Sequence, residues 1–239
     1  MGLDMSNVTN PSIMQGRQQR ATNHRRHPGL DPRSNELGQS QGIAGQARND
    51  EIDNGGSYEK QLRIAWGITG AGHLLSSCVE ILLPLEKADV FFSAAGLEVV
   101  KLYDLYNSLL GCGHTLYTEN DAGSLPVTRL YKGAYDLVVI APTTSNSVAK
   151  MVCGISDSLV TNLFAHAGKC KVPLLILPCD IEGDLTSDTH QGEQVSVHVR
   201  SVDRDNSKRL AKWPGVTLVQ SPNQLGEVLA SWKNPNTHL

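Results

Sequence analysis

Short apolar segments alternate with amphipathic segments from Leu62 onward, and this alternation constrains the fold more than any other feature. Each apolar segment has the length of a buried strand, and each amphipathic segment has apolar residues at helical spacing. We expect strands over residues 62–68, 89–92, 115–117, 136–140, 172–177 and 216–219, and helices over 73–85, 97–110, parts of 141–169 and 223–232. Strands that alternate with helices form a parallel sheet covered on both faces, so the sequence predicts a three-layer α/β domain.

Residues 1–58 differ in composition from the rest of the chain. They are rich in Asn, Gln, Arg, Gly, Ser and Pro and poor in branched apolar residues. Such a segment cannot bury enough apolar surface to offset its chain entropy, so we expect a disordered extension ahead of one domain over residues 59–239. The segment is locally basic through Arg17, Arg20, Arg25, Arg26 and Arg33. We interpret them as part of a solvated extension, with a nucleic-acid-binding or targeting arm as the alternative.

The composition narrows the class of protein. The chain has 239 residues, 40% of them hydrophobic, and a net charge of −3, which argues against a nucleic-acid partner. No apolar run approaches the roughly 18 residues of a membrane-spanning helix, and the N-terminus lacks the apolar part of a secretory signal. The five cysteines, an odd number, are typical of reduced thiols. We therefore expect a cytoplasmic protein that binds neither nucleic acid nor a membrane.

Three loops rich in glycine or hydroxyl side chains follow predicted strands. Residues 69–72 read Thr-Gly-Ala-Gly, residues 93–96 read Ser-Ala-Ala-Gly, and residues 142–147 read Pro-Thr-Thr-Ser-Asn-Ser. The carboxyl ends of parallel strands meet at one edge of a sheet, where ligands of such folds bind. The helix N-termini that follow offer unpaired N–H groups to an anion. The sequence therefore predicts one site for an anionic or polar cofactor at this edge.

Each loop also has a simpler interpretation. The glycine spacing at 67–72 matches neither G-x-G-x-x-G nor a P-loop, which argues against nucleoside-triphosphate hydrolysis and leaves a tight turn as the alternative. Ser93 can serve as a helix N-cap alone. Residues 144–147 carry more polar side chains than one cap needs, and this favours a ligand there.

The order of these motifs resembles a known family. Gly-Ile-Thr-Gly-Ala-Gly lies at 67–72, Ser-Ala-Ala-Gly at 93–96, Pro-Thr-Thr-Ser-Asn-Ser-Val-Ala-Lys at 142–150 and Gly-Ile-Ser-Asp-Ser-Leu at 154–159. This order is similar to that of the flavoprotein family of homo-oligomeric flavin-containing cysteine decarboxylases, whose later motifs read P-A-S-A-N-T-x-A-K and G-x-A-D-x-L. The resemblance implies a Rossmann-like or flavodoxin-like doubly wound sheet, non-covalently bound FMN and a homo-oligomer built from trimers.

The resemblance also implies roles for individual residues. The phosphate and ribityl chain of FMN would be held by Thr69, Gly70, Ala71, Gly72, His73 and Ser93. The ribityl chain and the flavin edge would contact Thr143, Thr144, Ser145, Asn146 and Ser147. Residues 154–159 would reach the site of a neighbouring subunit, and Cys179, at the end of a strand, would face the flavin.

Departures from the family motifs indicate a branch. The cysteine decarboxylases carry P-x-M-N after the fifth strand, and the flavin prenyltransferases carry Arg-Glu-x-Pro entering that strand. This chain reads Pro178-Cys179-Asp180 and Lys171-Val172-Pro173 at these places. Its runs over 153–162 and 167–173 resemble the archaeal-type dihydromethanopterin reductases. That resemblance implies hydride transfer from reduced FMN to the C=N bond of dihydromethanopterin, in one-carbon metabolism, with an electron donor that the sequence does not identify.

A pterin substrate has a guanidine-like edge that a carboxylate binds through two hydrogen bonds. The candidate carboxylates are Asp157, Asp180 and Glu182, and a helix cap or a solvated side chain is the alternative for Asp157. The proton for the pterin nitrogen would come from His73, a carboxyl group or water, so no catalytic residue is assigned. The spacing of the cysteines and histidines predicts no metal site.

Two rival functions share the predicted flavin site. One is a flavodoxin-like electron carrier with a protein partner, and the other is a lyase similar to phosphopantothenoylcysteine decarboxylase. The segment 180–212 is polar and includes an alternating stretch at 195–199. It would serve as a substrate lid or as a partner surface.

Overall fold

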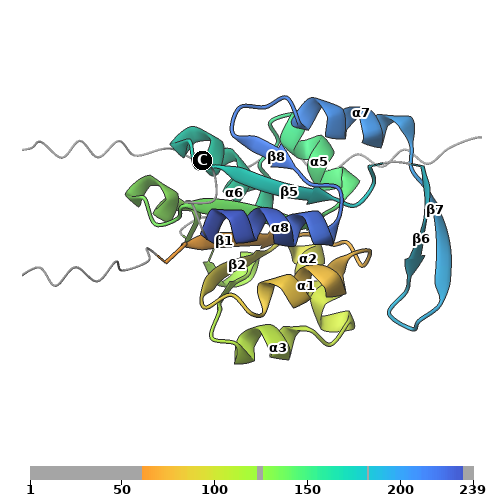
Figure 1. Cartoon of the computed structure of the whole chain (residues 1–239), viewed down its shortest axis with the longest axis horizontal. Coiled ribbons are helices and arrows are strands. Elements are labelled where there is room, and N and C mark those ends of the chain that lie inside the picture. The colour runs from red at the N-terminus through yellow and green to blue at the C-terminus, as the bar shows by residue number, and fades with distance from the viewer. Residues whose placement is uncertain (1–60, 123–125, 182, 234–239) are drawn as a thin grey trace, which may run out of the picture. The chain divides into compact units, whose positions relative to one another are not determined.

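The computed structural model describes residues 61–122, 126–181 and 183–233 (Figure 1). The N-terminal extension expected over residues 1–58 lies outside this part. Six parallel strands form a sheet in the order β3-β2-β1-β4-β5-β8. They are β1 (Ile64–Ile68), β2 (Ala88–Phe92), β3 (Thr115–Tyr117), β4 (Leu137–Thr143), β5 (Leu174–Pro178) and β8 (Val216–Leu218). This is the order of a doubly wound, Rossmann-like sheet, so the predicted α/β fold is confirmed.

Helices cover both faces of the sheet. One face carries α1 (Leu75–Leu82), α2 (Ala94–Leu102), α3 (Tyr106–Gly111) and α8 (Pro222–Lys233). The other carries the 3₁₀ helix η1 (Pro126–Lys132), α5 (Ser145–Val152), α6 (Leu159–Cys170) and α7 (Ser201–Leu210), and a short helix, α4 (Glu119–Ala122), follows β3. Within β1, Trp66 packs into the first layer and its neighbour Ala65 into the second. Successive side chains of a strand point to opposite faces, so each central strand is apolar throughout.

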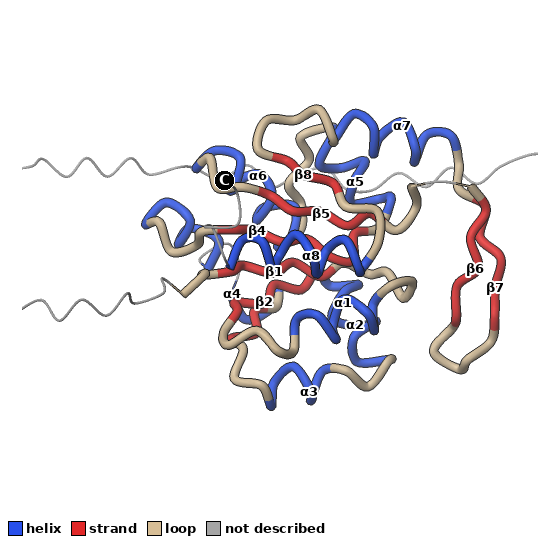
Figure 2. The backbone as a smooth tube through the Cα atoms, viewed as in Figure 1, coloured by secondary structure: helices blue, strands red, loops and turns tan. Residues whose placement is uncertain are grey.

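A β-hairpin is inserted between β5 and α7. Its strands, β6 (Asp184–Asp188) and β7 (Gln194–His198), pair with each other and not with the main sheet. Figure 2 shows the hairpin standing clear of the sheet. The alternating segment at 195–199 therefore belongs largely to one strand of an antiparallel hairpin. Neither β6 nor α7 was predicted from the sequence.

The single helix expected over residues 97–110 is two helices. Asp104 adopts a left-handed conformation with φ of 57°, which an α-helix does not tolerate, so α2 ends at Leu102 and α3 starts at Tyr106. Apolar spacing continues across the break, so the pattern alone did not reveal it. The break places Tyr103 at the end of α2.

Among the described residues, no helix combines the length and the apolar character that crossing a bilayer requires.

Candidate functional site

The chain leaves β1 and β4, the two central strands, toward opposite faces of the sheet. It passes from β1 to α1 on one face and from β4 to α5 on the other. Such a divergence opens a crevice at the carboxyl ends of the two strands. Thr69 ties the two loops together, because its N–H and its hydroxyl both donate to the carbonyl of Pro142, at 3.2 and 2.9 Å. The predicted loops therefore do meet at one edge.

A cavity of about 490 Å³ lies at this edge, between the strand ends and the β6–β7 hairpin. The strand ends contribute a first group of lining residues, all of them predicted from the sequence: Ala71, Gly72, His73, Thr144, Ser145, Cys179 and Asp180. The end of α2 and the hairpin contribute a second group: Val99, Leu102, Tyr103, Leu185, Ser187, Asp188, Thr189, His190, Val195 and Val197. The cavity thus has one wall of loops and a second wall that is largely hairpin.

Three of the predicted hydroxyl groups are used inside the protein. Thr69 accepts a hydrogen bond from the N–H of Thr144 at 2.8 Å, in addition to its bond to Pro142. The hydroxyl of the fully buried Thr143 donates to the carbonyl of Ile140 at 2.7 Å. Ser93 caps α2 by accepting from the N–H of Gly96 at 3.0 Å. These hydroxyls shape the loops, and their roles toward a cofactor stay predictions.

At the first turn of α5, some polar groups cap the helix and others are open, which means that they have no hydrogen-bond partner among the described residues. Thr144 caps the helix, accepting from the N–H of Ser147 at 3.2 Å and donating to its hydroxyl at 3.0 Å. The side chains and N–H groups of Ser145 and Asn146 have no hydrogen-bond partner among the described residues. Ser145 lines the cavity and Asn146 is exposed. This helix end therefore offers two N–H groups and two polar side chains to an anion.

The glycines of the first loop make room for the segment around α2. A Cβ on Gly70 would collide with Ala95, and a Cβ on Gly72 would collide with the hydroxyl of Tyr103. That hydroxyl also donates to the carbonyl of Asp188 in the hairpin, at 3.1 Å. Tyr103 thus links the first loop to the hairpin across the cavity. The N–H groups of Gly72 and His73 have no acceptor in the described part of the chain.

Three ionisable side chains meet where the first loop faces the end of β5. The Cys179 thiol donates to the carbonyl of His73, with sulfur and oxygen 3.6 Å apart. Burial raises the pKa of Cys179 far above its ordinary value, so the thiol is neutral. Burial lowers the pKa of the half-buried His73, and the carboxylates of Asp180 and Asp188 oppose this shift. The cavity therefore holds a histidine close to two negative charges.

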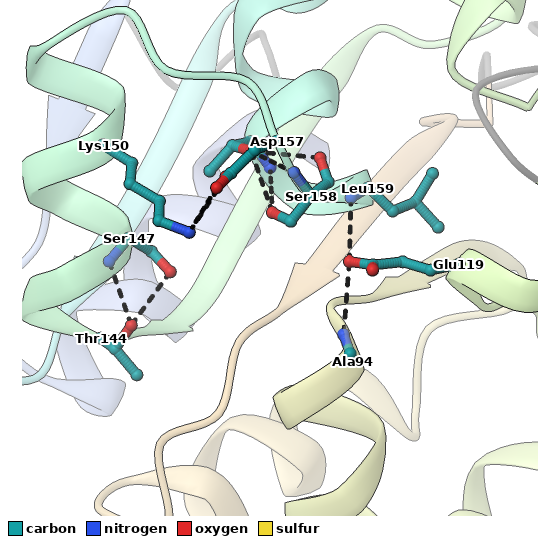
Figure 3. A network of polar contacts seen from close by, with 9 residues as sticks. Ala94, Glu119, Thr144, Ser147, Lys150, Asp157, Ser158 and Leu159 are labelled. Carbon is teal, nitrogen blue, oxygen red and sulfur yellow. Dashed lines mark hydrogen bonds and ion pairs between the residues drawn. The ribbon is translucent and has the colours of Figure 1, made fainter. Parts of the chain in front are cut away.

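Polar groups of α4, α5 and the start of α6 form hydrogen bonds and an ion pair near one another (Figure 3). We call the paired residues Glu119, Lys150, Asp157, Ser158 and Thr161 the helix-end network. The Lys150 ammonium lies 2.8 and 3.0 Å from the two carboxylate oxygens of Asp157 and lowers its pKa. Ser158 and Thr161 form a reciprocal capping box. Asp157, half exposed, does not line the cavity, so the structure separates it from Asp180.

Glu119 connects two helix ends within this network. One of its carboxylate oxygens accepts from the N–H of Ala94 at 3.3 Å and from that of Leu159 at 3.1 Å, as Figure 3 shows. These are the first residues of α2 and α6. A negative charge is favourable at a helix N-terminus, and here one carboxylate serves two of them.

Residues 54–231 match the family model described as Flavoprotein. The chain belongs to the flavoprotein family. An uncharacterised protein of Methanocaldococcus jannaschii is 35% identical over 175 residues, which cover 70% of this chain and 94% of that protein. A protein of the same organism named dihydromethanopterin reductase (acceptor) is 40% identical over 139 residues. That match covers 53% of this chain and 56% of the reductase, so it spans about half of that relative's length.

Among solved structures, this flavoprotein is similar to DmrB of Burkholderia xenovorans in complex with FMN, described as a cubic protein cage for redox transfer. The two chains are 38% identical, with a TM-score of 0.67, and the match covers 75% of this chain and 99% of DmrB. The branch indicated by the sequence motifs agrees with the names of these relatives.

Some residues of the cavity in this flavoprotein were missed by the sequence reasoning. Tyr103 lay inside an uninterrupted helical pattern, and Asp188 and His190 lay in a segment whose only signal was the alternation at 195–199. Glu182, a predicted substrate ligand, is outside the described residues. In the described ranges, no three or more His, Cys, Asp or Glu side chains gather as metal ligands would, and the five cysteines are free.

Proposed function

We propose that this protein is an FMN-dependent oxidoreductase that transfers a hydride to the C=N bond of dihydromethanopterin, giving tetrahydromethanopterin for one-carbon metabolism. The observation that carries the proposal is the cavity at the carboxyl ends of β1, β4 and β5, with open anion-binding groups at one side and His73 and Asp180 beside them. The names of the relatives at 38–40% identity support the same chemistry.

The residues at the edge of the sheet fit FMN. Its phosphate and ribityl chain would accept hydrogen bonds from the open N–H groups of Gly72 and His73, and the open groups of Ser145 and Asn146 at the first turn of α5 would hold the ribityl chain and the flavin edge. The neutral thiol of Cys179 would face the flavin. FMN supplies the hydride when it is bound and reduced, while the protein binds and orients the reactants.

Asp180 is the carboxylate best placed for the pterin. It lines the cavity, whereas Asp157 is paired with Lys150 outside it. A carboxylate at this position would bind the guanidine-like edge of the pterin through two hydrogen bonds. Leu102 and Val195, apolar residues of the opposite wall, would contact the face of the ring.

The cavity favours an enzyme over the two rival functions. It brings His73 and Asp180 together with the open groups of the loops, a polar set that a small-molecule substrate can use and that an electron carrier does not require. A lyase of the decarboxylase kind needs a group for the substrate carboxylate after β5, and this chain has Cys179 and Asp180 there in place of Met-Asn.

We further propose a cytoplasmic homo-oligomer built from trimers, in which residues 154–159 complete a neighbouring subunit's site. The description of the relative DmrB as a cubic protein cage supports an oligomer. The free cysteines support a reducing compartment. We propose that the flavoprotein domain spans residues 59–239. The electron donor is left unassigned.

Anaerobic stopped flow tests the proposed reaction. The bound FMN is reduced, mixed with dihydromethanopterin, and followed through its oxidised absorbance band near ~450 nm, the signature of the cofactor that carries the chemistry. We expect reoxidation much faster than that of free reduced FMN under the same conditions. Equal rates would contradict the proposed reaction, and purified protein that takes up no FMN would contradict the flavin site itself.

A further inference from the structure

His73 is fixed at the wall of the cavity by contacts on both sides of its backbone. Its carbonyl accepts from the Cys179 thiol, and Leu74, the next residue, adopts a left-handed conformation with φ of 65° before α1 begins. The N–H of Leu75 donates to the carbonyl of Gly72 at 3.1 Å, which closes the turn around His73. The imidazole therefore projects from a constrained loop and not from a free chain segment.

The ring of His73 is available to a ligand. Neither of its nitrogens has a hydrogen-bond partner among the described residues. Other histidines are committed elsewhere: Nδ1 of His114 accepts from the N–H of Ala88 at 3.2 Å, and Nδ1 of His198 lies 2.6 Å from an oxygen of Asp184. His190 also lines the cavity, from the hairpin, but it is exposed and its ring lies edge-on to Tyr103. His73 is thus the half-buried imidazole on the wall that would hold the flavin.

Both burial and charge act on the His73 imidazole. The titratable groups on the same cavity are Cys179 and Asp180 at the end of β5, Asp188 and His190 in the hairpin, and Tyr103 at the end of α2. The two carboxylates favour the imidazolium form, and partial burial favours the neutral ring. Burial is the larger influence, so the pKa of His73 lies below its ordinary value and the imidazolium is a stronger acid than that of an exposed histidine.

We propose that His73 is the general acid that protonates the pterin nitrogen during reduction of the C=N bond. This inference rests on the proposed function. The hydride brings its electron pair to the carbon and forms the new C–H bond, while the π electrons of the C=N bond take the proton of the His73 imidazolium and form the new N–H bond. The flavin is oxidised by two electrons, the pterin is reduced by two, and the neutral imidazole regains a proton from solvent.

A single-turnover experiment with His73→Gln tests the assignment, with His198→Gln as the control histidine variant outside the cavity. Glutamine keeps a hydrogen-bonding side chain but cannot ionise. We expect the variant to retain FMN and pterin affinity and to lose at least about 100-fold in the rate of FMNH₂ oxidation by dihydromethanopterin. The wild-type rate should fall about tenfold per pH unit above the pKa of His73, and the variant should lose this dependence.

A binding measurement gives a second readout that does not depend on turnover. In protein loaded with oxidised FMN, the imidazole signals of His73 are followed by NMR, assigned by their loss in His73→Gln or His73→Asn. Dihydromethanopterin should shift these signals and leave those of His198 in place. The proposal is overturned if the His73 signals do not move. It is also overturned if the variant reacts within about threefold of the wild-type rate and has the same pH profile. Either result would assign the proton to water or Asp180 instead.

The two proposals fail in different ways. Wild-type protein that oxidises no faster than free reduced FMN overturns the proposed function, and the role of His73 falls with it. Wild-type protein that reacts rapidly while His73→Gln reacts equally well overturns the role of His73 alone.

Discussion

The first turn of α5 and all of the helix-end network except Glu119 come from one stretch of sequence, residues 141–169, yet they use their polar groups in opposite ways. Ser145, which lines the cavity, and the exposed Asn146 keep side chains and N–H groups without partners in the described structure. In the network, Lys150 pairs with Asp157, and Ser158 caps α6. The sequence shows a similar density of hydroxyls, amides and charges in both regions. Polar groups with partners inside the protein stabilise the fold, and polar groups without such partners are free to bind a ligand.

This difference has a thermodynamic consequence. A hydrogen bond between two groups of the protein contributes to the free energy of unfolding, whereas an open group contributes to the free energy of binding. Substitutions of the network residues that bond to helix N–H groups should therefore destabilise the protein and leave ligand affinity almost unchanged. Substitutions at the open positions should do the reverse.

The largest effect is expected for Glu119→Ala. The substitution removes one carboxylate oxygen that accepts from the N–H groups of Ala94 and Leu159, so two helix ends lose a partner. We expect a loss of about 2 kcal/mol in the free energy of unfolding, measured by chemical denaturation. Glu119→Gln retains an accepting oxygen and should lose less.

The matched control is Asn120→Ala, at the neighbouring, exposed position of α4. It should leave stability almost unchanged. Equal stability of Glu119→Ala and Asn120→Ala would show that Glu119 does not join the two helices in solution.

The sheet and the position of the site were predictable from the sequence because both depend on local patterns. Runs such as Leu137–Ile140 are apolar throughout, which identifies strands covered on both faces. The carboxyl ends of parallel strands share one edge, so the loops that begin at Thr69 and Thr143 had to meet. The observed bonds from Thr69 to Pro142 confirm that the two loops are neighbours.

The second wall of the cavity could not be predicted because it depends on contacts between distant residues. Tyr103 reaches Asp188, 85 positions away, only because α2 breaks at Asp104 and the hairpin folds over the first loop. Whether a hydroxyl forms hydrogen bonds within the protein or stays open to a ligand also depends on distant residues. The Thr69 side chain, for example, bonds to Pro142 and Thr144. No spacing along the chain encodes these pairings.

An intermediate effect is expected at the first turn of α5, where an open and a paired residue lie two positions apart. Asn146→Ala should weaken FMN binding about tenfold, the loss of one hydrogen bond, and leave stability unchanged. Thr144→Ala removes the N-cap and should cost about 1 kcal/mol of stability. Fluorescence titration with FMN and thermal unfolding of both variants give the two readouts. Unchanged FMN affinity in Asn146→Ala would mean that this amide, although open, holds no part of the cofactor.

The smallest effect is expected for the Lys150–Asp157 ion pair, which belongs to the network but lies at its surface. Asp157 is half exposed, so water screens the pair, and Asp157→Asn or Lys150→Met should change stability at neutral pH by an amount close to experimental error. The lysine lowers the pKa of Asp157 in the folded protein. The contribution of the pair to the free energy of unfolding is therefore fully present above the pKa of an unfolded aspartate. It is lost as the pH falls through the lower pKa of the folded protein. Any difference in the free energy of unfolding between wild type and Asp157→Asn at neutral pH should therefore vanish in acid. A large loss of stability at neutral pH in Asp157→Asn would mean that this carboxylate has a partner beyond Lys150, and a neighbouring subunit reached by residues 154–159 is the partner that the proposed assembly would supply.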